Sequence, residues 1–155
     1  MSKIEQKLTE MGYAIEPIDQ MDNGNFSMAR RVGNLVFTSG KISSWNGEEV
    51  KGKVGVDISL DEAKHAALLC TLGTLQVLKT LLGDLDKIVN FVKINGMVNV
   101  GEDFCNTPGV INGCSEFIRE VFGDEVGAHA RTAVGMVLPN NFAVEIDMVL
   151  EVAPE

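Results

Sequence analysis

Residues 143–152 read AVEIDMVLEV and show the most regular alternation in the chain. Apolar side chains occupy every second position: Val144, Ile146, Met148, Leu150 and Val152. The positions between them hold three carboxylates: Glu145, Asp147 and Glu151. Because successive side chains of a strand point to opposite faces, the pattern predicts a strand with one core face and one polar face.

The segment before this strand also has strand character. Residues 132–138 are separated from residues 143–152 by Pro139-Asn140-Asn141, a combination typical of turns. The two segments therefore predict a hairpin.

The earlier part of the chain predicts further strands. Residues 26–39 (FSMARRVGNLVFTS) break at Gly33-Asn34, which predicts another hairpin, ended by Gly40. Residues 43–57 are mostly polar with three glycines and predict a loop with a short strand at best. Residues 88–98 are rich in β-branched side chains and predict one more strand.

Two segments carry helix start and stop signals. Ser59 and Glu62 form a capping-box pattern and Gly83 supplies a stop, which predicts a long helix between them. Its second half is apolar around most of its circumference, so it must be covered on more than one side. Thr107 as N-cap and Pro108 at the first helical position predict a helix over residues 108–122.

Together these elements indicate an α+β fold, a mainly antiparallel sheet with two main helices on one face. A shorter capping-box pattern from Ser2 to Gly12 predicts a peripheral helix over residues 2–11. No repeat or linker divides the 155 residues, so we expect one domain, with residues 1–23 as an N-terminal helical extension.

The composition argues against several classes of protein. Lys and Arg number 13 against 22 Asp and Glu, giving a formal net charge of −9 at pH 7. This charge repels nucleic acid and the basic residues do not cluster, so we expect no nucleic-acid partner. We see neither the apolar core of a signal peptide nor a membrane-length apolar stretch, so we expect no membrane partner and a cytoplasmic location.

Motifs for metals and nucleotides are missing from the sequence, so we expect no metal and no cofactor. Cys70, Cys105 and Cys114 include no C-x-x-C pair and are interpreted as reduced thiols, two of them packed on helices. His65 lies in the first turns of the long helix and is interpreted as a surface or packing residue.

The stretch His129-Ala130-Arg131-Thr132 is the candidate functional site. It places a histidine and an arginine at a strand entrance, and alternation puts both on the same side if the strand extends that far back. The residues alone leave two interpretations open for Arg131. It is either a surface arginine in a rim ion pair or a guanidinium that holds a ligand carboxylate by two hydrogen bonds.

Four groups of residues together form a pattern of known proteins. They are Gly33-Asn34 followed by LVFTSG, Asn112 with Glu116-Phe117, Ala130-Arg131-Thr132, and Leu138-Pro139 followed by Val144-Glu145-Ile146. With these residues the chain, from about Gly24 to Val152, resembles the Rid family, also called YjgF/YER057c-type proteins and often labelled "endoribonuclease L-PSP".

The resemblance implies a single Rid-like domain with a chorismate-mutase-like fold, assembled as a homotrimer with a site in each cleft between subunits. It implies cofactor-free hydrolysis of reactive 2-imino and 2-enamino acids, such as 2-aminoacrylate, to 2-oxo acids and ammonia. Arg131 matches the family's carboxylate-binding arginine, and Glu145 the glutamate that positions water or shuttles a proton. Ser39 and Asn112 match polar residues that line the pocket.

The chain also departs from the family's pattern near the expected site. Phe26 stands where well-known members carry a tyrosine, and His129 replaces a common proline, so both become candidate substrate-binding residues. The stretch from Gly96 to Asn106 is longer than usual, and the N-terminal helix is extra. These changes affect the identity of the substrate more than the fold.

A spacing argument bears on how the site is assembled. If residues 132–138 and 143–152 pair around Asn140, Arg131 lies opposite about residue 149 and roughly 13 Å from Glu145. The two would not meet within one hairpin. Either Arg131 bends away from the strand end, or Glu145 of another subunit completes the cleft.

Three functions follow from this pattern. The leading hypothesis is a deaminase of imines or enamines derived from small amino acids. The alternative is a trimeric binder or sensor that uses Arg131 to hold a small 2-oxo acid without turnover. A ribonuclease, which the family's older label suggests, is the least favoured because the chain is acidic and has no aromatic platform for bases.

Overall fold

The computed structural model describes residues 2–155. Its helices are α1 (Lys3–Glu10), α2 (Leu60–Leu82) and α3 (Thr107–Phe122). Its strands are β1 (Ala29–Val32), β2 (Leu35–Thr38), β3 (Lys41–Ile42), β4 (Ser44–Trp45), β5 (Glu48–Glu49), β6 (Ile88–Asn99), β7 (Ala130–Met136) and β8 (Val144–Val152). Short 3-10 turns cover Leu85–Lys87 and Pro139–Asn141.

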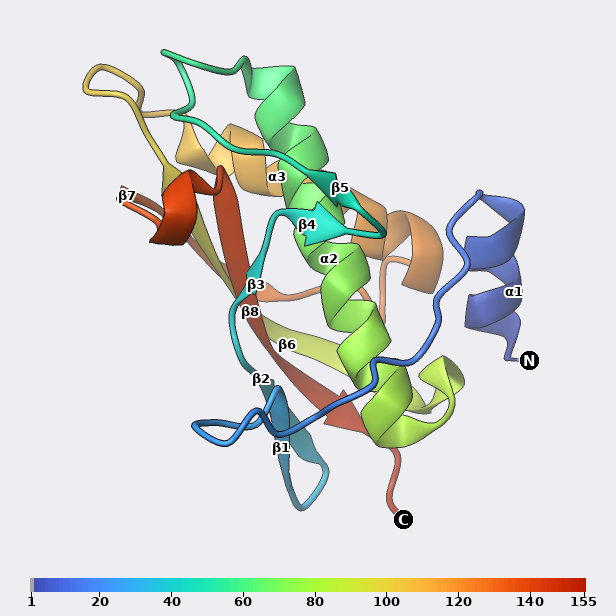
Figure 1. Cartoon of the computed structure of the whole chain (residues 1–155). Helices are drawn as coiled ribbons and strands as arrows, with labels where there is room; N and C mark the ends of the chain where they lie inside the picture. Colours follow the sequence, from blue (N-terminus) through green and yellow to red (C-terminus); the bar gives the residue numbers. More distant parts are fainter. Residues whose placement is uncertain (1) are drawn as a thin grey trace.

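The main sheet has six strands, in the order β1-β2-β8-β6-β7, with β3 also paired to β8. All neighbours are antiparallel except β6 and β7, which are parallel and joined through α3. Helices α2 and α3 pack against the same face of this sheet (Figure 1). The predicted α+β fold, with a mainly antiparallel sheet and two main helices on one face, is therefore confirmed.

Helix α2 forms the centre of the core. Its start has the predicted capping box between Ser59 and Glu62, and Gly83 ends it with a left-handed φ of 77°. The helix is long and apolar enough to cross a membrane, but 67% of its most apolar stretch is buried among the other elements. That burial makes α2 the core helix of this domain, and it agrees with an apolar surface that extends around most of the helix.

Helix α3 begins one residue earlier than predicted. Its N-cap is Asn106, whose side chain accepts a hydrogen bond from the backbone N–H of Gly109. Thr107 is instead the first helical residue, and its hydroxyl donates to the carbonyl of Ala133 on β7. The predicted cap at Thr107 was wrong because this hydroxyl links α3 to the sheet and the neighbouring asparagine takes the cap.

The segment around residues 26–57 contains more strand than expected. The hairpin that turns at Gly33-Asn34 is confirmed as β1 and β2. The stretch 43–57 was predicted as a loop with a short strand at best, and it holds two short strands, Ser44–Trp45 and Glu48–Glu49, that form a second, two-stranded sheet. This small hairpin lies over α2 and covers part of its apolar surface.

The predicted hairpin between residues 132–138 and 143–152 was wrong. Strand β6 lies between β7 and β8 and pairs with both. The connection from β7 to β8 crosses the end of β6, where Asn99 donates from its side chain to Asn141 and from its backbone to the carbonyl of Ala143. A turn-like sequence between two strands does not reveal whether a third strand inserts between them, and here the apolar β6 takes the central position.

The two faces of the sheet differ in what covers them. The inner face, which carries Ile94 and Ile146, packs against α2 and α3. No helix within residues 2–155 packs on the outer face. That face carries the carboxylates of β8 together with partly exposed apolar side chains from β2 and β7: Leu35, Phe37, Val134 and Met136.

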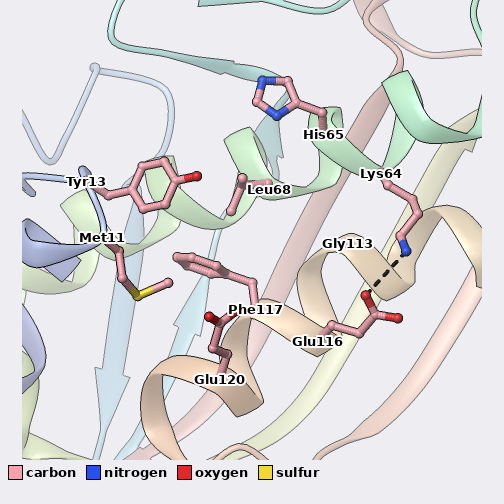
Figure 2. Close-up of a pocket in the computed structure, with 9 residues that line it drawn as sticks. All are labelled: Met11, Tyr13, Lys64, His65, Leu68, Gly113, Glu116, Phe117 and Glu120. Atoms are coloured by element: carbon pink, nitrogen blue, oxygen red, sulfur yellow. Dashed lines mark hydrogen bonds and ion pairs between the residues drawn. The ribbon is translucent and has the colours of Figure 1, made fainter. Parts of the chain in front are cut away.

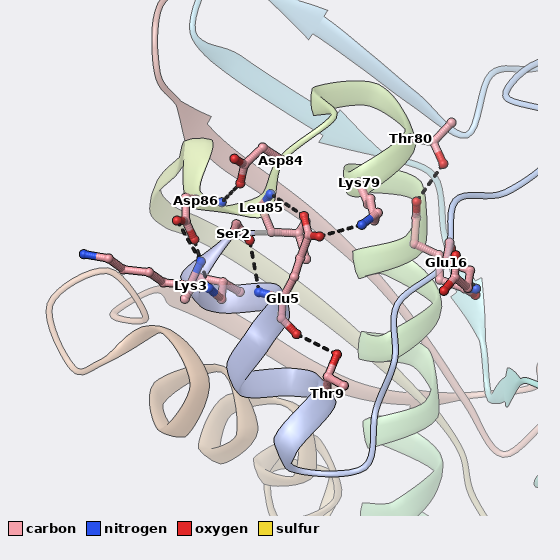
Figure 3. A network of polar contacts seen from close by, with 12 residues as sticks. Ser2, Lys3, Glu5, Thr9, Glu16, Lys79, Thr80, Asp84, Leu85 and Asp86 are labelled. Atoms are coloured by element: carbon pink, nitrogen blue, oxygen red, sulfur yellow. Dashed lines mark hydrogen bonds and ion pairs between the residues drawn. The ribbon is translucent and has the colours of Figure 1, made fainter.

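Helix α1 is fastened to the rest of the domain by a polar network (Figure 3). Glu5 is 7% exposed, and its carboxylate accepts from Nζ of Lys79 at 2.5 Å and from the backbone N–H of Leu85. Asp86 accepts from the first two N–H groups of the helix, those of Lys3 and Ile4. The Ser2 side chain caps the helix as predicted, but Glu5 reaches to α2 instead of closing the capping box.

Candidate functional site

Arg131 lies near the start of β7 and points toward α3. One of its terminal nitrogens, Nη1, donates to Oδ1 of Asn112 at 2.7 Å and to Oγ of Ser115 at 3.1 Å. Both acceptors are neutral and come from consecutive turns of α3. The helix therefore holds one corner of the guanidinium without neutralising its charge.

The remainder of the Arg131 guanidinium is free for a ligand. A guanidinium has five N–H donors, and the two on Nη1 are used by Asn112 and Ser115. Within residues 2–155, Nε and Nη2 have no hydrogen-bond partner and no carboxylate lies within 4.0 Å of Arg131. The rim ion pair is thus not seen, and the Nε–Nη2 edge keeps the geometry that matches a carboxylate.

Ser115 connects Arg131 to His129. The Ser115 hydroxyl lies 2.9 Å from Nε2 of His129, and Nδ1 of the same ring lies 2.7 Å from the carbonyl of Gly127. Strand β7 begins at Ala130, so strand alternation does not extend to His129, but both His129 and Arg131 contact Ser115. The sequence interpretation missed Ser115, although its position three residues after Asn112 places both on one helix face.

The imidazole of His129 is held in an environment that favours its neutral form. Burial lowers the pKa of His129 from its ordinary value of 6.5, and the positive charges of Arg119 and Arg131 lower it further. The Gly127 carbonyl acts in the opposite direction. The positive charges of Arg119 and Arg131 therefore disfavour a protonated imidazole at His129.

Glu145 lies on β8 and faces the outer side of the sheet. Its carboxyl group packs against the backbone at Gly40, where even a Cβ atom would come within 2.9 Å of Cδ of Glu145. Burial raises the pKa of Glu145 from its ordinary value of 4.5, and the negative charge of Asp147 raises it further. Glu145 is therefore a carboxyl group suited to carry a proton.

Arg131 and Glu145 do not meet within one chain. Arg131 is opposite Ile94 of β6, and Glu145 is opposite Met97 on the other side of the same strand. This register separates their backbones by roughly 14 Å. The predicted separation was based on a hairpin that does not exist. The two residues are nevertheless apart, because strand β6 lies between their strands and their side chains point from opposite faces of the sheet.

The remaining predicted residues, Ser39 and Phe26, lie near the β1–β2 edge of the sheet, on the same side of β6 as Glu145. Ser39 follows β2, and its hydroxyl donates to the carbonyl of Ser27 at 2.7 Å. Phe26 precedes Ser27 and is 53% exposed. Strands β8 and β6 lie between this corner and β7. The structure therefore gathers Arg131, Asn112 and His129 in one group and leaves Ser39, Phe26 and Glu145 in another.

A hollow of about 550 Å³ lies elsewhere, between α2, α3 and the segment after α1 (Figure 2). Its basic side chains already have partners, Lys64 in an ion pair with Glu116 at 3.3 Å and His65 in a hydrogen bond with Glu48 at 2.6 Å. The interpretation of His65 as a surface residue agrees with its exposed hydrogen bond to Glu48. Unlike the Arg131 group, this hollow offers no unpaired cation among its lining residues.

The cysteines and the metal-binding types of side chain form no reactive cluster. Cys70 and Cys114 are buried, and burial raises the pKa of both thiols, that of Cys114 to about 12, so they stay protonated. Cys105 is exposed. Among residues 2–155 no three His, Cys, Asp or Glu side chains lie close enough together to hold a metal ion.

The sequence matches a known family over most of its length. The model of the family described as "YjgF/chorismate mutase-like, putative endoribonuclease" matches residues 5–151. The chain belongs to this family. The predicted YjgF membership and the chorismate-mutase-like fold are confirmed, and the match includes most of α1.

Two solved structures show the same YjgF fold with good coverage. The protein Atu1372 from Agrobacterium tumefaciens, whose function is described as unknown, is 38% identical and superposes with a TM-score of 0.85, covering 96% of this chain and 91% of that chain. A protein from Shewanella oneidensis described as a "putative endoribonuclease" is 27% identical with a TM-score of 0.88, covering 97% of this chain and 100% of that chain.

A curated relative of this YjgF-family chain is the protein TCP17 of Trypanosoma cruzi. It is 42% identical over 101 residues, which is 64% of this chain. The match spans 63% of the length of TCP17.

Proposed function

We propose that the protein is a cofactor-free hydrolytic deaminase that converts reactive 2-imino and 2-enamino acids to 2-oxo acids and ammonia. The observation that carries this proposal is the state of Arg131. Its Nη1 is held by neutral acceptors while its Nε–Nη2 edge has no partner within residues 2–155. A half-buried guanidinium of this kind binds a small carboxylate with two parallel hydrogen bonds.

The carboxylate contact would fix the reacting carbon atom next to it. With the carboxylate on Arg131, C2 of the imine stands one bond away, and a water molecule adds to the C=N bond to form a carbinolamine. That intermediate loses ammonia and leaves the 2-oxo acid. Because imines hydrolyse readily in water, orientation and one proton carrier suffice for a useful acceleration.

Glu145 is the proposed proton carrier. Its raised pKa increases the fraction of the protonated form near neutral pH, and the carboxylate can accept the proton of the attacking water. Since Glu145 and Arg131 leave opposite faces of one sheet, we propose that Glu145 of a second copy completes each site. Ser39 and Phe26 would come from that copy as well.

A homotrimer is the assembly we propose for this purpose. The outer face of the sheet carries apolar side chains that are exposed in one chain, and Phe37 and Val134 are 45% and 42% exposed. Such a patch on a sheet face supports association with further copies. Free thiols at Cys70, Cys105 and Cys114 fit a reducing compartment, which supports a cytoplasmic location.

A second candidate is a binder of small 2-oxo acids without turnover. It is favoured by one observation: the Arg131 group is complete in a single chain, whereas Glu145 is not part of it. Ribonuclease activity is the least favoured, since the net charge of −9 opposes the approach of a polyanion.

The test is a coupled assay of imine hydrolysis. A serine dehydratase generates 2-aminoacrylate in situ, and release of pyruvate is followed with and without the protein. We expect acceleration by the wild type and a loss of at least about 100-fold in Arg131→Ala. Lys3→Ala is the control because it removes one positive charge from an exposed position on α1, away from the Arg131 group and the outer face of the sheet.

Three outcomes separate the candidates. No acceleration by the wild type rejects the deaminase for this substrate. Full activity in Arg131→Ala rejects the role of Arg131. Binding of pyruvate without turnover of any imine favours the binder.

A further inference from the structure

The contacts of Ser115 and His129 determine which atom is the donor in each hydrogen bond of the chain that ends at Arg131. The carbonyl of Gly127 can only accept, so the Nδ1 atom of His129 at 2.7 Å must carry a proton. In a neutral ring Nε2 is then an acceptor, and the Ser115 hydroxyl at 2.9 Å donates to it. The lone pairs of Ser115 are left to accept from Nη1 of Arg131.

The neutral form of His129 is the one that the surroundings favour. The charged groups that act on the ring are Arg119 of α3 and Arg131 of β7, and both are positive. Burial of the ring acts in the same direction. Every hydrogen bond along this path therefore has one defined direction, from Arg131 through Ser115 and His129 to Gly127.

The path ends in the loop between α3 and β7, which a backbone hydrogen bond ties to the end of α3. Gly127 donates its backbone N–H to the carbonyl of Gly123, the residue that ends α3. The hydrogen bonds thus run from Arg131 on β7 through Ser115 on α3 and His129 to the carbonyl of Gly127, in the loop between α3 and β7. A side chain held from both elements has few alternative rotamers.

We infer that Ser115 and His129 are positioning residues of the carboxylate site, forming a one-directional hydrogen-bond relay that orients the guanidinium of Arg131. This inference rests on the proposed function in taking Arg131 as the carboxylate receptor. The relay holds Nη1 and thereby presents the Nε–Nη2 edge to the ligand. His129 acts through Ser115 and does not touch the substrate.

The relay predicts a specific pattern of binding losses. Pyruvate is the probe, and its Kd is measured by calorimetry for Ser115→Ala, His129→Leu and the double variant. Ser115→Ala raises the Kd roughly tenfold, the effect of losing one hydrogen bond to a charged group. His129→Leu also raises the Kd, but it has no further effect in the Ser115→Ala background because its path to Arg131 is already broken.

A conservative variant separates positioning from packing. In His129→Gln the amide oxygen can stand where Nε2 stood and accept from Ser115, so we expect a Kd close to that of the wild type. Lost packing would not be rescued in this way. His65→Gln is the matched control, since His65 lies in the other hollow and its exchange leaves the Kd unchanged. Thermal unfolding of each variant shows that it is folded.

Two results overturn the relay. The first is that His129→Leu raises the Kd of pyruvate by the same factor in the wild type and in the Ser115→Ala variant. That result would mean that His129 acts on the ligand directly. The second comes from the nitrogen-15 spectrum of the imidazole. The relay requires a neutral ring protonated on Nδ1 at pH 7, whereas a ring protonated on Nε2 excludes it. The spectrum needs no ligand, so it tests the relay even if the wild type neither binds pyruvate nor hydrolyses imines.

Discussion

Arg131 and Glu145 stand on either side of strand β6 and point away from each other through opposite faces of the sheet. Neither can move to the other without breaking the ladder that β6 makes with both of its neighbours. A site that needs both residues must therefore take them from two chains.

Subunit complementation follows from this arrangement. Arg131→Ala and Glu145→Gln should each be inactive, but a refolded equimolar mixture should recover roughly a quarter of the wild-type activity if sites form between randomly mixed chains. Mixing Arg131→Ala with Asn112→Ala is the control, because one chain supplies both residues to the same half of the site, here called the Arg131 half-site. Recovery in that control mixture, or none in the first, contradicts the shared site.

Glu145 should lower stability at neutral pH. Its folded pKa is above the ordinary 4.5, so the folded state holds the proton more tightly, and stability falls as pH rises through the folded pKa. Glu145→Gln should raise the Tm at pH 7 by roughly 1–2 °C, and the gain should vanish below pH 4.5. Glu151→Gln is the comparison because its carboxylate accepts from Asn90, and it should bring no gain.

Gly113 should be essential for the position of Asn112 and Ser115, the residues of α3 that hold Arg131. A Cβ atom there would lie 2.1 Å from the backbone carbonyl of Lys64, where α2 and α3 cross. Gly113→Ala should separate the helices, cost about 2 kcal/mol in the free energy of unfolding and weaken pyruvate binding by displacing Asn112 and Ser115. Urea unfolding and calorimetry measure the two effects.

Gly73 provides the control for that substitution. It lies in α2, and a Cβ atom there would come within 3.1 Å of the end of the flexible Lys41 side chain and make an ordinary contact of 3.7 Å with the Ser44 carbonyl. Gly73→Ala should therefore be neutral or slightly stabilising, as expected for alanine in a helix. Equal losses in both variants would show that the crossing of α2 and α3 is not responsible.

The ion pair of Glu5 and Lys79 should hold α1 in place. Glu5→Ala leaves the Lys79 ammonium, whose side chain is 21% exposed, without its partner, so we expect a loss of roughly 2–3 kcal/mol in the free energy of unfolding. The exposed Glu10 on the same helix is the control, and Glu10→Ala should change stability by less than about 0.5 kcal/mol. A similar small change in Glu5→Ala would show that α1 is fastened by its apolar contacts alone.

The sequence predicted the helices and strands of the fold better than it predicted which strands pair with each other. The capping box at Ser59 and the alternation of β8 are local patterns, and both were confirmed. The pairing of β7 was not predictable, because the choice between β8 and β6 depends on contacts far apart in the chain. The cap at Asn106 was missed for the same reason, since a bond from Thr107 to β7 decides it.

The candidate site was predicted in part. Arg131, Asn112 and His129 were named in advance, and the structure brings them together. Ser115, which joins them, was overlooked because a serine in a helix carries no motif. Its spacing from Asn112 was the available signal. How Glu145 is placed relative to them remains a prediction about the assembly.

The unpaired charge of Arg131 also affects how the protein is handled in solution. The proposed carboxylate site would also accept other small anions, so we expect acetate, citrate or phosphate buffers to compete with pyruvate in the assay. By mass action such binding should also raise the melting temperature, because the unfolded chain has no formed site. Zwitterionic buffers with little added salt are therefore the conditions in which the true ligand can be recognised.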